Sequence, residues 1–285
     1  MKSITRKTLL YKSGVEYADY CINHVEGCAH GCRFPCYAMM MKKRCGIIKS
    51  YREWLQPKIV SNALELLDKE IPRLKHKINF VHLCFSTDPF MYKYPEVTEL
   101  TLKIIERLNK DNIRCTVLTK GIYPKALKDT TIYRENNEYG ITLVSLDEGF
   151  KRRFEPYSVP YKDRIESLRY LHEKGLKTWI SMEPYPTPNI IKQDLMNILR
   201  AISFVDKIIF GKLNYNTTSK QFRGNDLFYR DCTDLVINFC KANRIELHIK
   251  HGTQNVDSSK TENIFIKNLA KNLKYDIKQP NIFPE

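Results

Sequence analysis

The sequence lacks any long uninterrupted run of apolar residues. A helix that spans a bilayer needs about 18 to 20 of them, and the longest runs here are short stretches such as residues 141–146. The first ten residues, MKSITRKTLL, also lack the apolar core of a secretory signal. We therefore expect a soluble, cytoplasmic protein that makes no contact with a membrane.

The sequence also lacks internal repeats, low-complexity tracts and Gly/Ser-rich linkers, so 285 residues with 42% hydrophobic content are compatible with one large domain. Nine cysteines are an odd number, which excludes complete pairing in disulfides and favours a reducing compartment. Acidic residues are fewer than basic ones. The sequence has 32 Asp and Glu and 47 Lys and Arg, which gives a net charge of +15. This excess favours anionic partners such as nucleic acids.

Short β-branched segments alternate with longer amphipathic ones, which is typical of repeated strand–helix units. The expected strands cover residues 20–25, 78–85, 113–118, 141–146, 177–182, 207–210 and 246–249, and the expected helices cover 58–69, 96–109, 161–174, 190–204, 226–243 and 262–272. Gly175 is expected to end the third helix. About six such units predict one parallel sheet with right-handed crossovers, whose chemistry lies at the carboxyl ends of the strands.

Three of the cysteines lie close together, at Cys28, Cys32 and Cys36. Glycines and a proline between them favour a loop, in which three thiolates can converge on one point. One interpretation is a structural zinc site, with a fourth ligand from His24, His30 or Cys45. Another is an iron–sulfur cluster with one iron open to an outside ligand. Three thiols without a shared ligand are the third possibility, but the position after a strand favours the open-iron cluster.

The loop resembles that of radical S-adenosylmethionine (SAM) enzymes, most closely the spore photoproduct lyase-like (DNA repair photolyase-like) branch. The resemblance covers roughly residues 18–190 and includes the segments 58–67, 85–90, 119–120, 145–147, 153–156 and 164–169. It implies an α/β fold, a partial (β/α)6 TIM-like barrel over residues 1–225, with a short C-terminal α/β extension, residues 226–285, packed on it. One departure is that three residues, rather than the usual two, separate Cys32 from Cys36, so the loop must bulge.

The resemblance also implies a mechanism and its cofactors. Cys28, Cys32 and Cys36 would hold a [4Fe-4S] cluster, and S-adenosylmethionine would chelate the fourth iron. A flavodoxin or ferredoxin would supply the electron that cleaves SAM to methionine and a 5′-deoxyadenosyl radical.

The resemblance further assigns cofactor contacts to polar residues at strand ends. Lys120 and Ser145 would bind the SAM carboxylate, and Ser86, Thr87 and Asp88 would face its amino group. A turn without a ligand is the alternative for these three residues. Other cofactor-binding candidates are an Arg153–Glu155 ion pair that would shape the pocket and an aromatic ring, Tyr37 or Phe34, beside the adenine.

Two further residues are candidates for catalysis. Glu183 follows the fifth expected strand, where a carboxylate can touch substrate or the SAM ribose. Residues that follow the last two strands would surround the substrate: Lys212, Asn214, Tyr215 and His251. Cys84 is a candidate donor of a hydrogen atom to a product radical, and a buried core thiol is the alternative. Cys232 and Cys240 are expected in the core.

Three functions remain open from the sequence. The first is a radical SAM enzyme that repairs or modifies nucleic acid, because residues 30–60 carry seven basic residues against one acidic residue, a net +6. Aromatic residues in this stretch would stack on bases: Phe34, Tyr37, Tyr51 and Trp54. The second is a radical SAM enzyme for a peptide or small molecule. The third is a zinc-bearing nucleic-acid-binding module without catalysis.

Overall fold

A computed structural model describes residues 1–34 and 36–254, which form two compact units. Unit 1 contains Met1–Ile141 and Asp147–Thr178, and unit 2 contains Thr142–Leu146 and the described chain from Trp179 onward. The expected helix at 262–272 lies outside the described residues, as does much of the expected extension. The domain boundary at residue 225 therefore stays a prediction.

The main sheet of unit 1 is built from parallel strands. Its order is β8-β7-β6-β3-β2, in which only β2 runs antiparallel to its neighbour. The strand bounds are β2 (Leu10–Lys12), β3 (Tyr20–Ile22), β6 (Phe80–Leu83), β7 (Arg114–Thr119) and β8 (Glu138–Thr142). Fully buried Val81, Val117 and Ile141 show why these segments form strands, since β-branched side chains pack well on a pleated surface.

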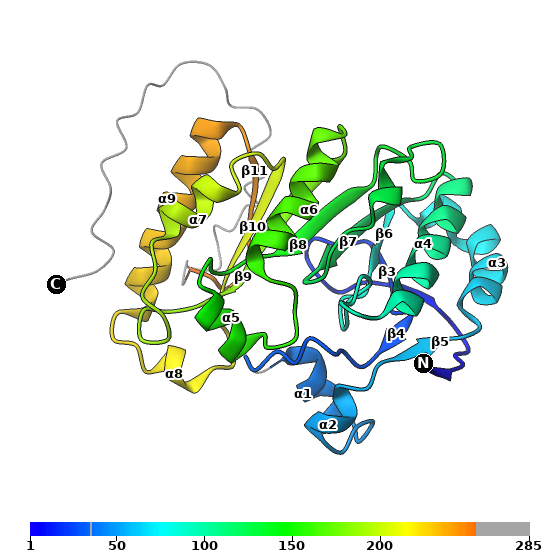
Figure 1. Ribbon diagram of the computed structural model, residues 1–285, viewed down its shortest axis with the longest axis horizontal. Coiled ribbons are helices and arrows are strands. Elements are labelled where there is room, and N and C mark those ends of the chain that lie inside the picture. Colours follow the sequence, from blue (N-terminus) through cyan, green and yellow to red (C-terminus); the bar gives the residue numbers. More distant parts are fainter. Residues whose placement is uncertain (35, 255–285) are drawn as a thin grey trace. The chain divides into compact units, whose positions relative to one another are not determined.

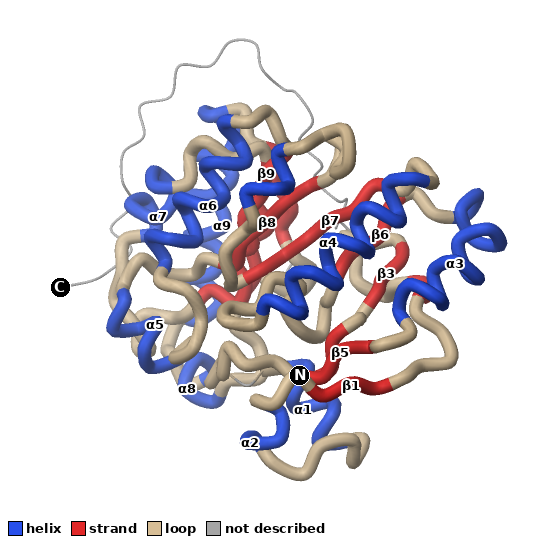
Figure 2. The backbone as a smooth tube through the Cα atoms, turned by 45° about the vertical axis from the view of Figure 1, so that its right-hand side comes forward, coloured by secondary structure: helices blue, strands red, loops and turns tan. Residues whose placement is uncertain are grey.

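Amphipathic helices cover this sheet. Besides two short helices described below, the unit 1 helices are α3 (Ala63–Leu74), α4 (Pro95–Lys110), α5 (Glu148–Phe154) and α6 (Tyr161–Glu173), with 3₁₀ turns η1 (Lys75–Lys77) and η2 (Lys125–Lys128). Figure 2 shows α3 and α4 side by side along the sheet. The helices expected at 96–109 and 161–174 are confirmed, and Gly175 follows α6 with φ of +80° as a helix-ending glycine should.

A second, small sheet corrects one expectation. It contains β1 (Lys2–Ile4), β5 (Lys58–Val60) and β4 (Val25–Glu26), with β5 in the middle. The expected helix at 58–69 is therefore wrong in its first part. Ile59 and Val60 pair with β1, and Ile59 also with β4, and this pairing outweighs the helical periodicity of the sequence. Two short helices, α1 (Tyr37–Arg44) and α2 (Tyr51–Trp54), were not expected.

The expected strand at 141–146 is also displaced, because β8 ends at Thr142. Leu143 and Val144 are fully buried beyond the end of that strand, and the Leu143 backbone N–H donates to the Ser181 carbonyl at 3.0 Å.

Unit 2 contains three parallel strands in the order β11-β10-β9. They are β9 (Lys177–Tyr185, in this unit from Trp179), β10 (Lys207–Lys212) and β11 (Glu246–Ile249), with helices α7 (Leu195–Ala201), α8 (Thr217–Lys220) and α9 (Asn225–Asn243). Helices α7 and α9 pack together, and α9 lies against β10 and β11 (Figure 1). Cys232 and Cys240 are buried in α9, as expected. Only residues 195–201 of the expected helix at 190–204 are helical.

The α/β class predicted from the sequence is confirmed by the parallel strands of both units. Among the helices in residues 1–34 and 36–254, none is long and apolar enough to span a membrane.

Candidate functional site

The three clustered cysteines lie in a loop of unit 1 that is held in place by α2. The Cys28 backbone N–H donates to the Trp54 carbonyl at 2.9 Å, and the Tyr51 hydroxyl donates to the Gly31 carbonyl at 2.6 Å. Gly27 has φ of +83°, and a Cβ there would lie 2.8 Å from the Trp54 carbonyl oxygen. A side chain at position 27 would therefore be strained and would collide with backbone. The sequence folds this way because glycine permits that close approach.

The thiols of this loop influence one another. Burial raises the pKa of Cys28, and its neighbours Cys32, Asp88 and Cys36 contribute to the same shift. Burial also raises the pKa of Cys32 to about 11, although the nearby Lys120 ammonium acts in the opposite direction. Thiols in such a setting need positive charge, either from a metal centre or from the protein, to become thiolates.

An iron–sulfur cluster fits this donor set. Each thiolate of such a cluster binds a different iron, so three ligands around one loop do not have to meet at a single ion. Within the described part of the chain, no three His, Cys, Asp or Glu side chains are positioned to hold one metal ion. Cys28, Cys32 and Cys36 are each partly accessible as residues.

Lys120 lies directly against the cysteine loop. It follows β7, and its Nζ donates to Cys32 Sγ at 3.4 Å and to Glu155 Oε1 at 2.6 Å. Arg164 Nη2 donates to the other carboxylate oxygen of Glu155 at 2.7 Å. Burial alone would raise the pKa of Glu155, but Lys120 and Arg164 outweigh it and lower the pKa to about 2. Glu155 is therefore ionised at neutral pH.

This arrangement corrects the expected ion pair between Arg153 and Glu155, which is wrong. Both carboxylate oxygens of Glu155 are taken by Lys120 and Arg164. The Arg153 guanidinium instead lies 5.1 Å from the centre of the Phe154 ring. The cause is burial, because Glu155 is 0% exposed and needs partners that are also inside the protein.

Asp88 joins the cysteine loop to the end of β7. Its carboxylate accepts hydrogen bonds from the Thr119 hydroxyl at 2.6 Å and the Lys120 backbone N–H at 2.7 Å, and it lies 2.9 Å from His30 Nε2. Burial opposes ionisation of Asp88, but His30 and these hydrogen bonds lower its pKa overall. The expected role of Asp88 at the SAM amino group stays a prediction, beside a structural role that the contacts define.

The neighbours Ser86 and Thr87 also contact the start of the loop. The Ser86 backbone N–H donates to Asn23 Oδ1 at 3.2 Å, and the Thr87 hydroxyl donates to the Val25 carbonyl at 3.2 Å. The segment after β6 is thereby fixed against the chain that leads into the cysteine loop.

The aromatic residues of the loop region separate into buried and exposed ones. Phe34 is buried and stacks on Phe154 with ring centres 4.9 Å apart, and Trp54 is also buried. The expectation that Phe34 and Trp54 stack on bases is therefore wrong, because both rings pack inside unit 1. Tyr37, the first residue of α1, is 60% exposed.

Cys84 lies in the core beneath the loop. It is 3% exposed and packs with Val25, Met91 and Val97, against which Cys28 also packs. Its Sγ lies 3.4 Å from Nδ1 of His24, whose Nε2 is 2.7 Å from the Thr101 hydroxyl. Burial raises the pKa of Cys84 to about 12, so the thiol keeps its proton, and its place in the core agrees with the expected alternative of a buried thiol.

Two predicted site residues, Glu183 and Ser145, belong to unit 2. Lys250 forms an ion pair with Glu183, and both side chains are partly accessible. Gly211 of β10 lies between them, since a Cβ there would be 3.0 Å from Glu183 Cγ and 3.2 Å from Lys250 Cβ. Ser145 is fully buried. The candidates at Asn214, Tyr215 and His251 are exposed, and Lys212 is partly buried.

Sequence reasoning missed the partners of these residues. Arg164 lies in a segment that resembles the family, but the resemblance assigns no role to this residue. The sequence indicates His30 only as a possible zinc ligand, and no pattern in it points to Lys250. An Arg at a helix position that faces the core is a usable signal, because buried arginines need a carboxylate.

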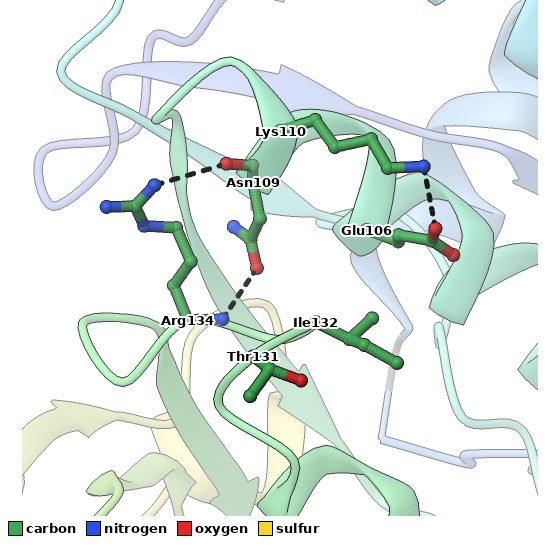
Figure 3. A pocket seen from close by; sticks show the side chains of 6 residues that line it. All are labelled: Glu106, Asn109, Lys110, Thr131, Ile132 and Arg134. Carbon is green, nitrogen blue, oxygen red and sulfur yellow. Dashed lines mark hydrogen bonds and ion pairs between the residues drawn. The ribbon is translucent and has the colours of Figure 1, made fainter.

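One pocket of about 270 Å³ opens at the opposite, amino-terminal edge of β7 and β8 (Figure 3). Its lining residues are Glu106, Asn109, Lys110, Thr131, Ile132 and Arg134. Several of them bond to one another, as Lys110 does to Glu106 at 2.7 Å and the Arg134 N–H does to Asn109 Oδ1 at 3.1 Å. The first bond lies within α4, and the second ties the end of α4 to the loop that precedes β8, so the pocket has a structural explanation.

Comparison with known proteins gives a family and a fold. The radical SAM superfamily model matches residues 22–202. An uncharacterized protein of Acidianus two-tailed virus is 27% identical over 199 residues, 66% of this chain and 64% of that protein. An uncharacterized protein of Methanocaldococcus jannaschii is 27% identical over 169 residues, which are 59% of this chain and 60% of that protein. The matches thus span less than two thirds of these relatives. Spore photoproduct lyase complexed with dinucleoside spore photoproduct has a similar fold, with a TM-score of 0.62, 14% identity, and coverage of 86% of this chain and 80% of that chain.

Proposed function

Because this chain belongs to the radical SAM superfamily, whose members use a [4Fe-4S] cluster and S-adenosylmethionine, we propose that it cleaves SAM reductively and acts on a nucleic acid. The substrate step would be lesion repair or base modification. We also propose that the protein works in a reducing cytoplasm and receives its electron from a donor such as flavodoxin or ferredoxin.

The observation that carries the proposal is the contact between Lys120 and Cys32. A partly buried ammonium 3.4 Å from a thiol sulfur stabilises a thiolate, the form that ligates iron. When bound, the cluster and SAM supply a radical that removes a hydrogen atom from substrate. The protein's own part is to hold Cys28, Cys32 and Cys36 on a loop fixed by α2, and to keep Glu155 ionised beside Lys120.

The preference for a nucleic acid is supported by charge at the loop. Of the seven basic residues in the stretch 30–60, five are exposed: Arg33, Lys43, Arg44, Lys49 and Arg52. Tyr37 is also exposed, and together with the partly buried Tyr51 it remains an aromatic candidate for stacking on a base. The fold of spore photoproduct lyase, which was solved in complex with dinucleoside spore photoproduct, gives further support.

The decisive experiment follows 5′-deoxyadenosine. Anaerobically reconstituted protein is incubated with SAM, a reductant and single-stranded DNA, duplex DNA, RNA or a peptide, each deuterated at exchange-stable positions. We expect deuterium in 5′-deoxyadenosine with one of the nucleic acids, and binding of that substrate that weakens steeply as salt increases. Deuterium from the peptide alone, or binding unaffected by salt, would contradict the nucleic-acid assignment.

Glu183 is proposed to bind the substrate. We expect Glu183→Gln to lower kcat/KM for the nucleic acid by about 10- to 100-fold, the equivalent of losing one hydrogen bond to a charged group. Lys250→Met should act in the same direction, because Lys250 is the ion-pair partner of that carboxylate. Asp234→Asn, an exposed change on α9, serves as the control. Unchanged SAM cleavage together with unchanged substrate turnover in Glu183→Gln would remove Glu183 from the site.

A further inference from the structure

Three charged side chains of unit 1 form a line that ends at the sulfur of Cys32. Lys120 contacts both Cys32 Sγ, at 3.4 Å, and Glu155, at 2.6 Å. Arg164 contacts the far oxygen of Glu155 at 2.7 Å. The side chain of Lys120 is 16% exposed, and those of Glu155 and Arg164 are 0% exposed. The ammonium on Cys32 is thus held at one position inside the protein.

The charges in this line do not cancel. Two cations share one carboxylate, so the triad of Lys120, Glu155 and Arg164 has a formal charge of +1. Arg164 also donates to the Ser158 hydroxyl and the Val159 carbonyl. Both ends of the triad are cationic, and the Lys120 end is the one that touches Cys32.

From this geometry we propose that Lys120, held by Glu155 and Arg164, raises the reduction potential of the cluster ligated by Cys32. The added electron makes the cluster more negative, and a fixed positive charge in a site of low dielectric constant favours that form. A hydrogen bond to the ligating sulfur acts in the same direction. The inference rests on the proposed function, because it requires the cluster.

This role differs from binding the SAM carboxylate, which the resemblance assigns to Lys120. A carboxylate contact has no effect before SAM binds. The effect of the ammonium on the cluster is present in the protein without SAM. Measuring the potential in the absence of SAM therefore isolates it.

The test compares three variants with the wild type by potentiometric titration of the reconstituted cluster, monitored by electron paramagnetic resonance without SAM. Lys120→Met removes the charge, Lys120→Arg keeps it, and Lys128→Met removes an exposed charge from the same segment. In Lys120→Met we expect the ratio of reduced to oxidised cluster at the wild-type midpoint to fall by about tenfold, which corresponds to about 59 mV for one electron. Lys120→Arg should stay closer to the wild type, and Lys128→Met should equal it.

A wild-type ratio in Lys120→Met at full iron content would overturn the inference. Where Lys120→Met holds no cluster, Lys120→Gln is titrated instead, since its amide still donates a hydrogen bond but has no charge. A wild-type ratio in that variant would also overturn it. Wild-type protein that assembles no cluster would contradict the proposed function, which separates the two failures.

Discussion

Cys32→Ala is expected to assemble no intact cluster and to release no detectable 5′-deoxyadenosine from SAM. Removing a residue that only orients a metal ligand costs roughly 10- to 100-fold in affinity or activity, and removing the ligand itself should cost more. Cys32 is also the sulfur that Lys120 contacts. The measurements are iron and sulfide content, the visible spectrum, and chromatography of the SAM products after reduction.

The matched control is Cys45→Ala. Cys45 ends α1, close to the loop in sequence, and it is exposed. It was also one of the residues available as a fourth zinc ligand. We expect this variant to keep its cluster and its activity. Loss of metal from Cys45→Ala, with one zinc bound by the wild type, would support the zinc-site interpretation and contradict the cluster.

Arg164→Met is expected to lower the free energy of unfolding by about 3 to 5 kcal/mol, the usual cost of breaking a buried ion pair. Arg164 and Glu155 are both 0% exposed, so the substitution leaves a buried carboxylate with one cation instead of two. Denaturant unfolding of the metal-free protein measures the effect. Arg169→Met, an exposed change on the same helix, should alter stability by less than about 1 kcal/mol. Equal effects of the two substitutions would contradict this account.

The same ion pair predicts how stability depends on acid. The pKa of Glu155 is lowered from 4.5 to about 2, so its contribution is present above pH 4.5 and is lost as the pH falls toward 2. Glu155→Gln lacks this titration. Its stability should therefore change less with pH than that of the wild type in this interval, and an identical pH dependence would argue against the pairing.

Much of the fold followed from short-range patterns. Helix α4 has an apolar stripe that the sequence makes plain, and the cysteine loop is marked by its glycines. The pairing of β5 could not be predicted, because residues 58–60 pair with residues 2–4 at the other end of a long stretch of chain. Local periodicity contains no information about such partners, and tertiary pairing decides the outcome.

The candidate site also has some features that the sequence predicts and others that depend on residues far apart in the chain. The candidate residues at strand ends were predictable, because parallel strands bring their carboxyl ends to one edge. Their partners were not: 88 residues separate Lys120 from Cys32, and 67 separate Lys250 from Glu183. Arg153 was the plausible partner of Glu155 by sequence distance, yet Arg164 takes that place because it is buried beside the carboxylate.

The attachment of the cysteine loop to α2 has a consequence for how the metal-free protein behaves. The Tyr51 hydroxyl donates to the Gly31 carbonyl and the Cys28 backbone N–H donates to the Trp54 carbonyl, and neither bond involves a thiol. The loop therefore keeps its conformation through bonds that do not depend on iron, unlike a zinc finger, in which metal binding drives folding. Little ordering entropy is left to be lost when the cluster assembles. Oxygen damage to the cluster should thus leave a folded chain that can be reloaded with iron and sulfide.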